Sequence, residues 1–145
     1  MIELAKTSAL ANASWQALNL STTSSNNTAV GSYSLRANTT GTNNIAVGAA
    51  EFSVDYGALG YNTTGNNNIA VGMQALLNST TASNNTAVGH HASRTNTTGA
   101  SNVAVGTQAL YSNTTASNNT AVGYQTAYTN TTGERNVAIG GPAVG

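Results

Sequence analysis

A short unit that ends in Ala-Val-Gly, once in Ala-Ile-Gly, recurs along this chain at a nearly constant spacing. The intervals between the closing glycines are 17, 24, 17, 17, 17 and 17 residues. These glycines are Gly31, Gly48, Gly72, Gly89, Gly106, Gly123 and Gly140. A fixed period of this length is the signature of stacked repeats, in which each unit packs on its neighbours. The spacing therefore predicts a solenoid with one unit per turn.

The residues within each unit favour β-structure over helix. Residues 118–123 read Asn-Asn-Thr-Ala-Val-Gly, which is a short strand bounded by Asn and Gly. Residues 108–110, Gln-Ala-Leu, are interpreted as a second short strand, and the turn begins at residues 113–115. No apolar stripe of period 3.6 continues far enough for a helix. The chain is predicted to be an all-β, parallel β-solenoid (a β-roll) of about seven 17-residue turns.

The repeat also predicts how the chain is divided. Residues 15–140 are predicted to form the solenoid, and the segment 49–57 contains an insertion of seven residues relative to the other units. Residues 1–14 are interpreted as a degenerate repeat or junction segment, and residues 141–145 as an incomplete last turn. The five tail residues and the 14 head residues of a second copy sum to 19, close to one turn. Copies that stack head to tail through a shared turn fit this sum, and a fragment of a longer fibre is the alternative.

The composition excludes several classes of function. Only 6% of the residues are charged and the formal net charge is zero, so neither a nucleic-acid partner nor a membrane surface is expected. Hydrophobic residues make up 39% of the chain, and those at fixed phase are mainly Ala and Val, which suit a narrow core. The sequence has no cysteine and no apolar stretch of membrane-spanning length.

Stacked turns place equivalent residues in columns about 4.8 Å apart along the axis. The Ala column is Ala29, Ala46, Ala70, Ala87, Ala104, Ala121 and Ala138. The Val column is Val30, Val47, Val71, Val88, Val105, Val122 and Ile139. A third column, expected to hydrogen-bond through its amides as an Asn ladder, is Asn27, Asn44, Asn68, Asn85, Asn102, Asn119 and Asn136.

Adjacent strand residues face opposite ways, so either the Ala column or the Val column must point outward. The residue before each Ala is Thr, Ile or Val and shares a side with the Val column. A single coil therefore leaves an apolar strip on its outside, which usually marks an interface. Lateral, symmetric association with copies of the same chain is the expected way to cover it.

The unit Asn-Thr-Ala-Val-Gly-x-x-Ala resembles the head repeats of trimeric autotransporter adhesins and the shafts of bacteriophage tail fibres. It is seen at residues 119–123, with its small residue at Thr126, and at residues 102–106, followed by Ala109. The likeness covers about residues 15–145, although the adhesin repeat is shorter. The resemblance implies a left-handed β-roll, three chains side by side, and an extracellular location on a virion fibre or a cell-surface filament.

Two groups of residues are candidate sites. The insertion at 49–57 can present a binding loop, for which Glu51, Phe52, Asp55 and Tyr56 are the candidates. His90 and His91 are expected at a strand start, with their rings on opposite faces, where one set could hold a metal in a three-chain bundle. Carboxylate and thiolate co-ligands at matching spacing are absent from the sequence, so surface or interface histidines are the alternative.

The expected function is structural. No Asp or Glu lies at a spacing that would orient either His beside a Ser nucleophile, so no enzyme activity and no cofactor are expected. The chain is expected to be a stiff oligomeric shaft of a tail fibre or filament. An adhesin that binds a host-surface glycan or protein through the 49–57 loop or its lateral surface is the alternative. An ice-binding solenoid, based on the repeated Thr pairs, is a third class.

Overall fold

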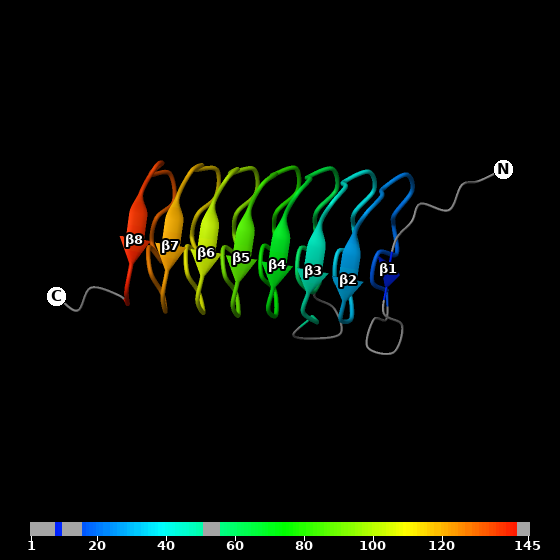
Figure 1. Ribbon diagram of the computed structural model, residues 1–145, viewed down its shortest axis with the longest axis horizontal. Coiled ribbons are helices and arrows are strands. Elements are labelled where there is room, and N and C mark those ends of the chain that lie inside the picture. The colour runs from blue at the N-terminus through cyan, green and yellow to red at the C-terminus, as the bar shows by residue number, and fades with distance from the viewer. Residues whose placement is uncertain (1–7, 10–15, 51–55, 142–145) are drawn as a thin grey trace.

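The computed structural model describes residues 8–9, 16–50 and 56–141 and places its strands side by side in one row along the long axis (Figure 1). All neighbouring strands are parallel and follow the order of the chain. The strands are β1 (Ser8–Ala9), β2 (Thr28–Val30), β3 (Ile45–Val47), β4 (Ile69–Val71), β5 (Thr86–Val88), β6 (Val103–Val105), β7 (Thr120–Val122) and β8 (Val137–Ile139). The protein is therefore an all-β parallel β-solenoid, as the 17-residue spacing predicts.

The register keeps equivalent residues of successive turns opposite one another. Ala87 of β5 pairs with Ala70 of β4 and with Ala104 of β6, and the flanking residues follow the same rule. At the first pair of strands Ala9 lies opposite Ala29, an interval of 20 residues. From β2 to β8 the coil completes about six turns of about 17 residues, one fewer than expected, because the first and last units are incomplete within the described residues.

The core is one side chain thick. The Ala at the centre of each strand points inward, and those of β2 to β7 are fully buried. A column of buried leucines packs against them from the other side of the coil, and it comprises Leu18, Leu35, Leu59, Leu76 and Leu110. Small residues on one wall and a single Leu on the other fill the narrow space at close-packed density. The same contact repeated turn after turn replaces the thick core of a globular domain.

The segment expected as a second strand is a turn, so that prediction is wrong. Gln108 and Leu110 have φ of 57° and 53°, in the left-handed region, with Ala109 between them. Their amides still bond neighbouring turns, from Gln108 N to the His90 carbonyl and from Leu110 N to the Thr126 carbonyl, both 2.9 Å. The left-handed residues turn the chain sharply around the end of the narrow core, which an extended strand cannot do.

The closing glycines of the inner turns lie where successive turns approach closely. Gly89 has φ of 136°, and a Cβ atom built there would lie 2.5 Å from the carbonyl oxygen of Gly106. Both the backbone conformation and the contact exclude a side chain at this position. The Gly after Val in each unit therefore sets the spacing between turns.

Candidate functional site

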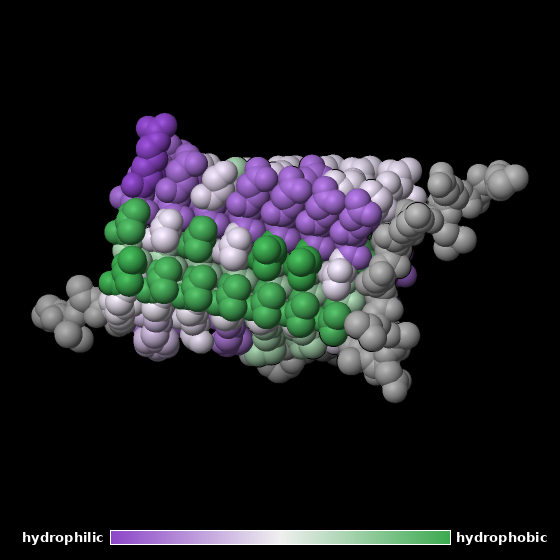
Figure 2. Space-filling model, in the orientation of Figure 1, coloured by the Kyte–Doolittle hydropathy of each residue, from purple (hydrophilic) through white to green (hydrophobic). Residues whose placement is uncertain are grey.

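The outer side of the strands forms an apolar surface, here called the strand face. Figure 2 shows two rows of side chains across β2 to β8, one green throughout and the other a mixture of green and white, bordered by a purple polar band. The continuous row is the column from Val30 to Ile139, and the mixed row comprises the first residue of each strand: Thr28, Ile45, Ile69, Thr86, Val103, Thr120 and Val137. Since the Ala column is inside, the Val column is the one that points outward.

The Asn residues before β2 to β7 lie inside the coil, where they connect neighbouring turns. Asn85 Oδ1 accepts a hydrogen bond from the backbone N–H of Asn102 at 2.9 Å. Its Nδ2 donates to the carbonyl oxygen of Gly99, also at 2.9 Å. The backbone N–H of Asn85 in turn donates to Asn68 Oδ1. The column thus bonds mainly to backbone groups that would otherwise be buried without partners.

A second column of polar residues is also buried, and the sequence analysis missed it. Asn113 Nδ2 donates to Asn96 Oδ1 at 3.0 Å and to the carbonyl oxygen of Ala116 at 2.9 Å. The column contains Asn38, Asn62, Ser79, Asn96, Asn113 and Asn130. The signal was present, because Asn-Thr-Thr recurs in five of these six turns. It was interpreted only as a surface turn.

The candidate loop is described only in part. Glu51, Phe52 and Asp55 lie outside the described residues. Tyr56 is described, and its ring lies 4.3 Å from that of Tyr61, centroid to centroid. On either side of the insertion the chain stays stacked on its neighbours: the Ala50 N–H bonds the Ser32 carbonyl at 3.1 Å, and the Ala58 N–H bonds the Gly48 carbonyl at 3.0 Å, as in an ordinary turn. The insertion therefore leaves the stacking of the turns intact.

The two histidines do not point to opposite faces. His91 has φ of 57° and lies in the turn after Gly89, not at a strand start, so the alternation of an extended strand does not apply. The rings of His90 and His91 stack with their centroids 3.7 Å apart. Among the residues that the structure describes, no three or more His, Cys, Asp or Glu side chains gather as a metal site. The same residues include no helix with the length and hydropathy to cross a membrane.

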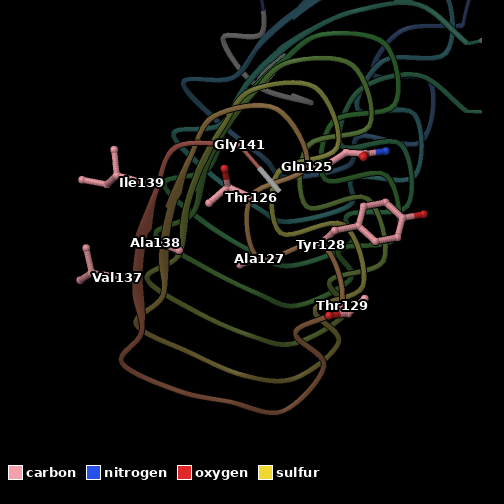
Figure 3. A pocket seen from close by; sticks show the side chains of 9 residues that line it. All are labelled: Gln125, Thr126, Ala127, Tyr128, Thr129, Val137, Ala138, Ile139 and Gly141. Carbon is pink, nitrogen blue, oxygen red and sulfur yellow. The ribbon is translucent and has the colours of Figure 1, made fainter. Parts of the chain in front are cut away.

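Aromatic and cationic side chains gather opposite the strands, on what we call the turn face: residues 32–37, 56–61, 73–78, 90–95, 107–112 and 124–129. All six tyrosines of the chain belong to these segments. Figure 3 shows Gln125, Tyr128 and Thr129 projecting away from the coil on the side opposite Val137 and Ile139. The rings of Tyr111 and Tyr128 stack with centroids 5.0 Å apart. The strand face and the turn face are thus two separate surfaces of one coil.

The last described turn is open at its outer end. A recess of about 870 Å³ lies there between the turn face and β8, lined by residues such as Thr126 and Ala138 (Figure 3). Val137 and Ile139 are 74% and 76% exposed, far more than their equivalents in the inner turns. The recess is the space that a further turn of the same coil would fill.

The paired threonines divide into two columns with different environments. Thr97 Oγ1 donates to the carbonyl oxygen of Thr114 in the next turn at 3.0 Å, and Thr63 bonds Thr80 in the same way. The neighbouring Thr98 is exposed, as are its equivalents in the other turns. The exposed hydroxyls therefore form a single file, whereas an ice-binding face needs a two-dimensional array.

No model of a known protein family, no curated protein and no solved structure matches this chain.

Proposed function

We propose that this chain is a structural segment of an extracellular fibre, in which copies associate side by side through their strand faces. The observation that carries the proposal is the apolar strip, which continues over β2 to β8 without a charged side chain. An uninterrupted apolar surface of this kind marks an interface. Stiffness would come from the backbone hydrogen bonds that connect every turn to the next.

A second copy of the chain is the partner that fits this surface best. Both copies carry the same columns at the same spacing along the axis, so side chains of one copy can pack between those of the other, turn after turn. In an assembly with closed symmetry, the strand face of every copy is covered by another copy. The resemblance to adhesin heads and tail-fibre shafts favours three copies and a left-handed coil, on the outside of a virion or a cell.

Axial stacking extends the same proposal. The turn of β8 has no neighbour on its outer side within the described residues, and its recess is lined by residues of the core columns. A coil end with unpaired backbone groups favours pairing with another chain. Head-to-tail stacking of copies would cover this end and lengthen the shaft, and electron micrographs of the purified chain would then contain filaments longer than one copy.

Two exposed lysines on the strand face test lateral association. The paired changes Val71→Lys and Val105→Lys place like charges on one strip and should convert the trimer to monomers. The paired changes Thr107→Lys and Tyr124→Lys add the same charge to the turn face and should leave the trimer intact. Sedimentation velocity gives the mass, and circular dichroism checks that each variant keeps its β-structure.

Two outcomes would contradict the proposal. A wild-type chain that sediments as a monomer at micromolar concentration has no lateral partner of its own kind. A strand-face variant that folds and remains a trimer would place the interface elsewhere.

An adhesin is the second candidate, favoured by the aromatic and cationic side chains of the turn face. In that case the fibre would hold a binding surface away from its axis, as loops on a rigid scaffold often do. A screen of glycans and host cells should then detect binding, and deletion of residues 50–56 would separate the insertion from the rest of the turn face. Unchanged binding by the deleted chain removes the insertion from consideration.

A further inference from the structure

Arg94 lies on the turn face between two uncharged side chains from neighbouring turns. Its Nε donates to Gln74 Oε1 at 3.0 Å, and its Nη1 donates to the Tyr111 hydroxyl at 3.4 Å. The ring of Tyr111 is also 6.2 Å from that of His91, centroid to centroid. Three successive turns therefore each contribute to one cluster around the guanidinium.

The same cluster occurs a second time. Arg36 Nε donates to Gln16 Oε1 at 2.8 Å, and its Nη1 donates to the Tyr56 hydroxyl. The Gln precedes the Arg by 20 residues in both clusters. Tyr33 stands at the position of His91, and the Arg36 guanidinium lies 5.6 Å from the centroid of its ring. The two arginines are three turns apart, or roughly 15 Å along the axis.

The arrangement orients each guanidinium but leaves its charge uncompensated by these partners. A guanidinium has five N–H donors, of which Gln and Tyr take one on Nε and one on Nη1. The remaining donors on Nη1 and Nη2 form the flat fork that binds a carboxylate through two parallel hydrogen bonds. At Arg36 the rings of Tyr33 and Tyr56 lie beside the guanidinium and lower the local polarity, which strengthens such a pair.

Gln74 supplies a second observation. Its side chain is 99% buried, and since its Oε1 accepts from Arg94, its Nε2 is the donor end of the amide. This Nε2 has no hydrogen-bond partner among the described residues. A buried donor without an acceptor is destabilising, so this amide favours an acceptor oxygen bound at Arg94.

From these contacts we propose that the two Gln–Arg–Tyr clusters are equivalent binding sites for a carboxylate-bearing saccharide. Arg94 and Arg36 bind the carboxylate, while the surrounding Tyr hydroxyls bind the sugar hydroxyls. Two arginines on a chain of zero net charge are too few to hold a nucleic-acid backbone. A polysaccharide with acidic residues at regular intervals can occupy both sites on one rigid axis.

The test measures binding of four carboxylated glycans: polysialic acid, hyaluronan, polygalacturonate and alginate. Each is compared with its carboxyl-reduced form, which keeps the sugar and loses the charge. The wild-type chain should bind at least one of the four and not its reduced form. With a short oligosaccharide of that glycan, calorimetry should give two sites per chain, one site in Arg94→Gln or Arg36→Gln, and none in the double variant.

A matched control comes from Arg135, the third arginine in the described ranges, which is exposed and lies outside both clusters. Arg135→Gln removes the same charge and should keep both sites. Tyr111→Phe keeps the ring but loses the hydroxyl that orients Arg94, so it should weaken one site by about threefold to tenfold, equivalent to the usual 0.5–1.5 kcal/mol of one hydrogen bond. Loss of a charge-assisted pair in Arg94→Gln should weaken that site by tenfold or more, roughly 1.5–3 kcal/mol.

Three results would overturn the proposal. The first is that the chain binds none of the four glycans at millimolar sugar. The second is that it binds the reduced forms, or dextran sulfate, as tightly as the carboxylated glycan. The third is that Arg135→Gln and Arg94→Gln lose the same amount of affinity. The monomeric strand-face variant should keep both sites, so failure of lateral association and failure of saccharide binding are separate outcomes.

Discussion

The strand face and the turn face belong to the same turns, yet they differ in how much their residues vary. At the end of each strand from β2 to β8 the residue is Val six times and Ile once. On the turn face, the residues that follow the closing glycines differ in almost every turn. In five turns they are Ser32, Met73, His90, Thr107 and Tyr124.

The difference shows which positions the stacking of turns constrains. A column must suit its neighbours above and below, and where it also faces the core or a partner copy, only one size and polarity fits every turn. The exposed side chains of the turn-face segments share the same spacing but project away from the coil, so each turn can carry a different residue there. In a repeat protein of this kind, uniform columns indicate structure and variable columns indicate the surface available for recognition.

The closing glycines should give the largest effect. Gly89→Ala places a side chain on a residue with positive φ and makes it clash with the Gly106 carbonyl. The substitution should therefore lower the free energy of unfolding by about 3 kcal/mol or more. Gly140→Ala is the matched control, because its φ is 126° but no atom lies within 4 Å of the added Cβ. It should cost only the backbone strain, about 1–2 kcal/mol.

Urea unfolding at one fixed chain concentration measures both glycine variants, since stability of an oligomer depends on concentration. Equal losses in the two variants would mean that the close approach between turns contributes nothing.

Adjacent asparagines allow the inside and outside of one turn to be compared. Asn85→Ala removes the acceptor of Asn102 N–H and the donor to the Gly99 carbonyl, both buried, and should cost about 2–4 kcal/mol. Asn84 is exposed, has φ of 62° and accepts one long hydrogen bond, from Asn67 Nδ2 at 3.4 Å, so Asn84→Ala should cost about 1 kcal/mol or less. Thermal unfolding of the two variants side by side measures the difference, and a larger loss at Asn84 would contradict the inward role of the Asn85 column.

The parts of the fold that follow from spacing alone could be predicted from the sequence. The period places Ala87 opposite Ala70 and Ala104, and the strand register agrees. Which of Ala and Val faces inward could not be predicted, because alternation fixes only that they face opposite ways. The choice depends on core width, which is set by the Leu column on the far wall.

Two other features escaped the sequence analysis for physical reasons. Leu110 carries no local signature of a left-handed conformation, since Leu is an unusual residue there and only the tight turn around the core requires it. The cluster at Arg36 depends on the path by which the insertion brings Tyr56 to it, which no spacing rule gives. The repeated separation of 20 residues between Gln and Arg was visible, but its meaning required the knowledge that these positions lie on adjacent turns.

The smallest expected effect concerns a position where the backbone, and not a contact, decides the residue. Ser101 is exposed with φ of 57°, where the equivalent residue of most other turns is Asn. Ser101→Gly should raise the free energy of unfolding by up to about 1 kcal/mol, because Gly adopts this conformation without the cost that a Cβ adds.

Thr107 is the control, because it is also exposed but is not among the residues with positive φ. Thr107→Gly should lower the free energy of unfolding by about 0.5–1 kcal/mol, because Gly adds freedom to the unfolded chain. Urea midpoints that move in opposite directions would tie the preference for Asn in this column to backbone conformation, whereas a loss of stability in both variants would contradict that explanation.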